Sequence, residues 1–134
     1  MDTTKGYAPH VTKVVSRFEK IRFAYLFGSI LESSQFRDID VALYLPAEMD
    51  SYRRIKYGMK VARETEKALD YAKEVDVRVI NDAPVEFQYE VVKTGKVVFS
   101  RDDRGRIRFE AQVLSSYMDY RETAGWLKRE LLEA

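Results

Sequence analysis

Apolar positions along the chain follow two different periods. Short runs rich in β-branched and aromatic residues, bounded by Gly, Pro or Asp, predict strands at about 22–27, 38–45, 75–80 and 97–99. Apolar residues three or four positions apart predict helices at about 8–20, 51–72, 85–94 and 109–132. Strands that alternate with helices in this way predict an α/β (α+β) fold, a small mixed β-sheet flanked by helices. At 134 residues we expect one domain, residues 1–134.

The helix predicted at 51–72 carries an apolar stripe. Ile55, Met59, Ala62 and Leu69 fall on one face, and we expect this face to cover the sheet. Its basic residues, among them Arg54, lie largely elsewhere on the helix, where solvent is their ordinary environment.

The last predicted helix carries an apolar seam at alternating steps of four and three residues. Its members are Val113, Tyr117, Tyr120, Ala124, Leu127 and Leu131. Such a seam packs on another helix. Either it covers the sheet, or it docks a partner or a second copy of the chain, so an oligomer formed through this helix is one of two open readings.

Composition excludes several classes of function. Lys and Arg number 23 against 22 Asp and Glu, a net charge of +1, whereas a strongly electrostatic nucleic-acid binder is more basic, so we do not expect direct nucleic-acid binding. The absence of cysteine excludes disulfides, thiolate metal sites and cysteine nucleophiles. No apolar run approaches the roughly 20 residues that span a bilayer, so we expect no membrane contact and a cytoplasmic location.

Two acids open the strand predicted at 38–45. Side chains on a strand alternate between faces, so Asp38 and Asp40 project from the same side while Ile39 turns into the core. Adjacent carboxylates repel each other unless a cation lies between them, and Mg²⁺ prefers such oxygen ligands. The pair predicts a magnesium site; the plainer interpretation is two solvent-exposed acids at a strand end.

The turn before this strand is suited to phosphate. Gly28 lets the backbone approach a ligand closely, and Ser29 supplies a hydroxyl and a helix N-cap with neighbouring N–H groups. The two residues are therefore candidate nucleotide-binding residues for a triphosphate such as ATP.

A third acid, Asp76, lies inside the apolar strand predicted at 75–80. We expect it to be buried there, which is costly for a carboxylate without a partner. Its partner is either a metal ion shared with Asp38 and Asp40, or Arg78 two residues further on. Three carboxylates can ligate one or two divalent ions, one of which would activate an attacking hydroxyl. Asp76 can alternatively act as the general base.

The order Gly28-Ser29, Asp38-x-Asp40 and a later strand Asp76 resembles the motif of the polymerase beta superfamily of nucleotidyltransferases. This resemblance implies the polymerase-beta-like nucleotidyltransferase fold, with Mg²⁺ as cofactor and ATP as substrate. It also implies that the three acids are the catalytic and metal-binding residues. Eight residues separate Ser29 from Asp38, a shorter connection than in the family's usual motif.

The small size and the downstream segments 75–85 and 89–102 resemble the minimal nucleotidyltransferase (MNT) branch, over about residues 18–120. MNT proteins commonly pair with HEPN proteins, small helical ribonucleases, as the antitoxins of toxin–antitoxin modules. The resemblance implies transfer of AMP from ATP to a tyrosine of a HEPN partner. Two alternatives remain open: a catalytically weak or inactive module that neutralises its partner by binding, and nucleotidyl transfer to RNA or a small molecule.

Overall fold

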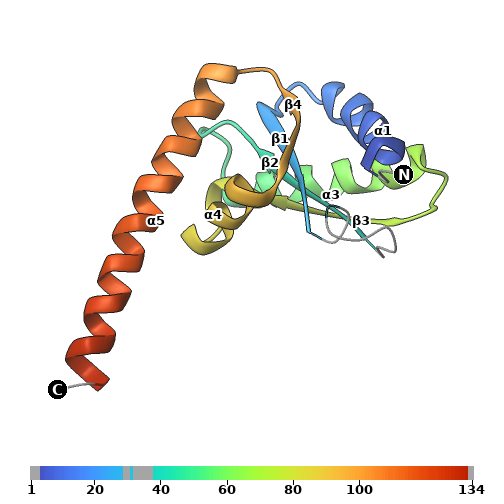
Figure 1. The fold of residues 1–134 in the computed structure, drawn as a ribbon. Coiled ribbons are helices and arrows are strands. Elements are labelled where there is room, and N and C mark those ends of the chain that lie inside the picture. The colour runs from blue at the N-terminus through green and yellow to red at the C-terminus, as the bar shows by residue number, and fades with distance from the viewer. Residues whose placement is uncertain (1–3, 29–30, 32–37, 133–134) are drawn as a thin grey trace.

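A computed structural model describes residues 4–28, 31 and 38–132 (Figure 1). In chain order the elements are α1 (Thr4–Ser16), β1 (Phe23–Phe27), β2 (Asp38–Tyr44), α3 (Ser51–Ala68), β3 (Glu74–Val79), the 3-10 turn η1 (Ile80–Asp82), α4 (Val85–Thr94), β4 (Lys96–Ser100) and α5 (Asp103–Leu132). All predicted elements are present. The first helix begins and ends about four residues before its expected bounds, and the strands agree to within two residues.

The sheet is mixed, as the short connection between the first two strands predicts. Its strand order is β3-β2-β1-β4. β1 pairs antiparallel with both β2 and β4, whereas β2 and β3 run parallel. β3 and β4 are therefore the edge strands of this sheet, and the α3 helix makes the crossover that a parallel pair requires.

Two apolar layers lie on the two faces of the sheet. On one face, α1 and α3 cover the sheet (Figure 1). They pack against inward-facing strand residues such as Ile39, Val41 and Leu43, all almost completely buried. On the other face, α4 and the start of α5 cover an aromatic cluster that includes Phe23, with Tyr44 stacked on its ring at 4.5 Å. The second face holds the carboxylates described below.

The face of α3 that covers the sheet differs from the expected one. Its buried residues are Arg54, Gly58, Val61 and Thr65. Of the four residues expected to pack inward, Ala62 and Leu69 do pack on the core, whereas Ile55 and Met59 are 61% and 55% exposed. The helix is thus rotated about one position from the orientation that its apolar residues predict.

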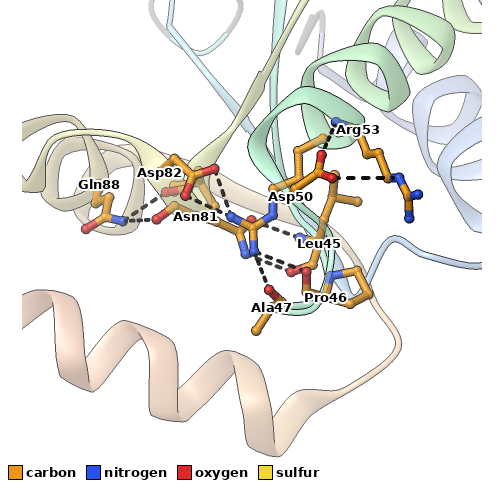
Figure 2. Close-up of polar contacts among 10 residues, drawn as sticks. Leu45, Pro46, Ala47, Asp50, Arg53, Asn81, Asp82 and Gln88 are labelled. Carbon is orange, nitrogen blue, oxygen red and sulfur yellow. Dashed lines mark hydrogen bonds and ion pairs between the residues drawn. The ribbon is translucent and has the colours of Figure 1, made fainter.

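Polar contacts of Arg54 account for this rotation, and Figure 2 labels its partners Asp82, Pro46 and Ala47. One guanidinium nitrogen donates to both carboxylate oxygens of Asp82 at 2.8 Å, and the other donates to the carbonyl oxygens of Pro46 and Ala47. Asp82 precedes α4 in the chain but accepts from Arg54, and no side chain caps that helix. A buried charge with these partners outweighs the exposure of two apolar side chains.

Asn81 secures the same corner of the fold (Figure 2). Its side-chain amide donates to the carbonyl of Leu45 at 2.7 Å and accepts from the Leu45 N–H at 2.9 Å. The Gln88 amide in α4 donates to the backbone carbonyls of Ile80 and Asn81. These bonds tie the end of β2 to η1, which follows β3, and tie η1 to α4.

The α5 helix begins at Asp103, six residues before the expected start near 109. Asp102 extends it by accepting the Gly105 N–H at 3.0 Å, which satisfies one of the free donors of the first turn. Val113 is its only buried residue among those that the structure describes. The first half of this helix packs along α4, and its second half leads away from the rest of the molecule (Figure 1). No described helix is long and apolar enough to cross a membrane.

We expect Arg54→Met to lower the free energy of unfolding by about 2 kcal/mol, because it removes the hydrogen bonds of a buried guanidinium to the half-exposed Asp82 and to two backbone carbonyls. The measurement is urea unfolding followed by circular dichroism. Arg53→Met is the matched control: its side chain is 75% exposed, so we expect a loss below about 0.5 kcal/mol. Equal losses for the two variants would contradict this account of α3.

Candidate functional site

Strand pairing brings the three predicted acids onto one face of the sheet. In the parallel pair, Asp40 of β2 lies beside Asp76 of β3, and Asp38 lies beside Glu74. Ile39 and Val75, between them, point to the opposite face and are buried. Neighbours across a ladder share a face, so four carboxylates occupy adjacent positions at this end of the sheet.

Glu74 is the member of this group that the sequence analysis missed. It precedes Asp76 by two residues on β3 and therefore shares its face. The alternation of acids and valines from Glu74 to Val77 already carries this signal. The sequence did not show that Glu74 lies beside Asp38, because this depends on the register of β3 with β2, which only the structure supplies.

The expected burial of Asp76 is wrong. Its side chain is 53% exposed, because β3 is an edge strand and the carboxylate face is open there. The Nε atom of Arg78 lies 3.7 Å from its Oδ2 atom, so the alternative partner predicted from the sequence is present. Burial therefore gives no support for a metal at Asp76.

Asp40, one of these four carboxylates, has a raised pKa. Its pKa is raised above the ordinary value of 3.8, first because the carboxyl is partly buried and then because the charges of Asp76 and Asp38 repel it. Arg78 acts in the opposite direction and lowers it. A cation beside Asp40 would relieve this repulsion.

Gly28 closes the site from the β1 side. Phe27 pairs with Asp40 across the ladder, and Gly28 follows with a φ of +78°, a conformation that other residues rarely adopt. A Cβ atom added at Gly28 would collide with the Asp40 carboxylate. The predicted close approach therefore exists, and it brings the turn against the catalytic candidate. Ser29 lies outside the described residues.

The ligand chemistry fits Mg²⁺, which prefers carboxylate oxygens. As the side chains stand, however, no group of three or more His, Cys, Asp or Glu residues could hold a metal ion within the part of the chain that the structure describes. Asp76 is turned to Arg78. Asp38 and Asp40 can offer ligands from one strand, and Asp76 has to leave Arg78 to join them.

An aromatic and basic border adjoins the carboxylates. The Arg78 guanidinium lies 5.2 Å from the centre of the Phe87 ring, and Phe87 packs edge-to-face on Phe27 at 5.3 Å. Phe27 is the ladder neighbour of Asp40. α4 thus places an aromatic ring over the strand ends, beside the acids, a feature that sequence spacing did not reveal.

Residues 10–104 match the family model for Polymerase beta, Nucleotidyltransferase. The chain belongs to this family. The match contains Gly28 and the carboxylates of β2 and β3, and it ends at the second residue of α5. The resemblance inferred from the motif is confirmed, as is the expected fold class. No curated protein sequence matches the chain.

Several solved structures share the fold. The crystal structure of the toxin-antitoxin MntA-HepT matches with a TM-score of 0.70 and 19% identity, over 96% of this chain and 98% of that chain. A toxin-antitoxin with AMP-PNP matches with a TM-score of 0.71 and 22% identity, over 93% and 98%. A tri-AMPylated Shewanella oneidensis HEPN toxin in complex with MNT antitoxin matches with a TM-score of 0.70 and 20% identity, over 96% and 98%.

We expect Asp40→Asn to raise the melting temperature of the metal-free protein at pH 7. The folded state holds the Asp40 proton more tightly than the unfolded state, so the free energy of unfolding falls as the pH rises above 3.8. Asp40→Asn removes this pH-dependent loss of stability. The difference in melting temperature between the variant and the wild type should therefore shrink toward pH 3.5. Thermal unfolding with a chelator at both pH values measures this, with the exposed Glu64→Gln as control. An unchanged melting temperature at pH 7 would contradict the raised pKa assigned to Asp40.

Proposed function

We propose that this protein is a Mg²⁺-dependent adenylyltransferase that transfers AMP from ATP to a protein hydroxyl, a tyrosine of a HEPN-type toxin. Family membership supports nucleotidyl transfer. The observation that carries the proposal is the placement of Asp38, Asp40 and Asp76 on one face of the sheet, with Gly28 against Asp40.

The Gly28 turn and the three acids have different roles in the proposed transfer. The triphosphate lies over the Gly28-Ser29 turn, where the backbone can approach it closely. Asp38, Asp40 and Asp76 would hold Mg²⁺, which would supply charge screening of the phosphates and a lower pKa of the attacking hydroxyl. The hydroxyl oxygen bonds to the α-phosphorus, the bond from that phosphorus to the bridging oxygen breaks, and pyrophosphate leaves. The hydroxyl proton passes to solvent or to Asp76.

The partner is proposed from the neighbouring structures and from α5. One of those structures holds an AMPylated HEPN toxin with an MNT antitoxin, which supports the same role here, that of the antitoxin in a cytoplasmic module. The second half of α5 exposes apolar side chains that no described residue covers. Trp126 is 52% exposed and Leu131 is 75% exposed, and we assign this surface to binding of the toxin.

A second candidate is a binding module without catalysis. The ion pair between Asp76 and Arg78 favours it, since an acid neutralised by arginine needs no metal. The two functions share the toxin-binding surface and differ only at the carboxylates, so transfer of label separates them.

We expect the wild-type protein to label a protein band from α-labelled ATP and Mg²⁺ in a lysate containing its native partner. Asp40→Asn should reduce the rate about 100-fold or more, because a bound metal ion supplies several kcal/mol to such a reaction. Glu64→Gln, on the opposite side of the sheet, should label at the wild-type rate. If neither wild type nor Asp40→Asn transfers label while both capture the same partner, the binding module is the better description.

Mg²⁺ with a non-hydrolysable ATP analogue should raise the melting temperature of the wild-type protein by several degrees, because a ligand bound only by the folded state stabilises it. We expect most of this shift to disappear in Asp40→Asn. A shift of the same size in both proteins would show that the nucleotide does not use these carboxylates. Differential scanning fluorimetry makes the measurement.

A further inference from the structure

A groove runs beside the carboxylates along the outer edge of β3. It has a volume of about 450 Å³ and lies between α3, β3 and the start of α4. Gly58, Val77 and Val79 form its floor, and the exposed side chains of Ile55 and Met59 form one wall. These are the two apolar residues of α3 that were expected to pack on the sheet.

The groove follows from the rotation of α3. The ion pair of Arg54 with Asp82 turns Gly58 toward β3, and a Cβ atom there would lie 3.4 Å from Val77. The missing side chain leaves both valines partly open. β3 pairs only with β2 among the described strands, so one side of its backbone is available to another strand. Such edges bind extended peptides through main-chain hydrogen bonds, with pockets for alternate side chains.

Two side chains connect the groove to the candidate active site. Arg78 and Phe87 line the groove and also border the acids, since Arg78 pairs with Asp76 and Phe87 packs on Phe27. These two side chains therefore form the junction between the groove, whose Val77 and Val79 lie on the other face of β3, and the carboxylates.

The two sides of the carboxylate group suit different substrates. Gly28 lies on the β1 side, where the backbone admits phosphate. Asp76, on the β3 side, is the acid assigned to the attacking hydroxyl. An acceptor therefore approaches over β3, which is the side on which the groove lies.

We propose that the groove binds an extended segment of the acceptor protein and places its tyrosine ring against Phe87 and Arg78, beside Asp76. This rests on the proposed adenylyltransferase activity and adds the residues that select the acceptor. The ring of Phe87 offers an aromatic surface to the phenol, and the guanidinium of Arg78 lies above the ring.

Charge at the junction favours an acidic segment. Asp82 is already paired with Arg54, and Arg78 loses its counter-ion once Asp76 turns to a cation. Arg78 is then a free positive charge at the mouth of the groove. An acidic residue next to the accepting tyrosine complements it.

In the transfer step the phenol oxygen forms a bond to the α-phosphorus of ATP. The bond between that phosphorus and the bridging oxygen breaks, pyrophosphate leaves, and the phenol proton passes to solvent or to Asp76. The groove residues take no part in these bonds. They raise the fraction of acceptor held with its oxygen near the phosphorus.

Two substitutions test the groove. Met59→Glu changes its wall, and Phe87→Ala changes its junction with the carboxylates. On the acceptor protein that the wild type labels, we expect each to raise the KM for acceptor about tenfold, with the KM for ATP changed less than about twofold. Phe87→Tyr keeps the ring and should restore acceptor binding. Tyr52→Glu, which changes a side chain 67% exposed on the same helix outside the groove, is the matched control and should behave as wild type.

An unchanged KM for acceptor in Met59→Glu and Phe87→Ala, with active wild type, would overturn the groove and leave the proposed activity intact. Failure of wild type to label any protein would instead overturn the activity itself. Met59 is on the surface, so Met59→Glu decides the matter even if Phe87→Ala does not fold. Mass spectrometry of the labelled acceptor should find AMP on a tyrosine with an acidic neighbour. AMP on serine, threonine or lysine would overturn the role of Phe87.

Discussion

The parallel register of β2 and β3 is the constraint on which the site depends. It sets Asp40 against Asp76 and leaves Ile39 and Val75 in the core. A slip of one residue in β3 would turn Asp76 toward the core and expose the valines to solvent. The loss of buried apolar surface makes this slipped register unfavourable. The apolar side of the sheet, packed under α1 and α3, therefore fixes the position of the acids on its other side.

Much of this arrangement was predictable from local patterns. Alternation within 38–45 and 74–79 gave the strands and the face of each acid, and the Gly28 turn could be placed by its neighbours. The phase of α3 could not be predicted, because the partner of Arg54 is 28 residues away and hydrophobicity gave no sign of it. The exposure of Asp76 was missed for a similar reason, since an edge strand is defined by topology.

The carboxylate group opposes folding of the metal-free chain and is retained at a strand end where water reaches it. Arg78 offsets part of the repulsion by pairing with Asp76. The Asp76 carboxylate is thus already occupied by an ion pair in the metal-free chain. A bound cation and Arg78 would therefore compete for the carboxylate oxygens of Asp76. In the metal-free protein the proposed site is ordered, but Asp76 is not yet free to bind a cation.

The α5 helix has a consequence for the local stability of the unbound chain. Tyr117 stacks on Tyr89 of α4 at 3.7 Å, and Tyr120 donates a hydrogen bond to Glu86. From 121 to 132 every described residue except Gly125 is exposed, and isolated helices shorter than about 12–15 residues are marginal in water. Amide hydrogens should therefore exchange faster toward Leu132 than near Val113. A protein that binds the Leu132 end can change its conformation at a smaller cost in free energy than it could near Val113.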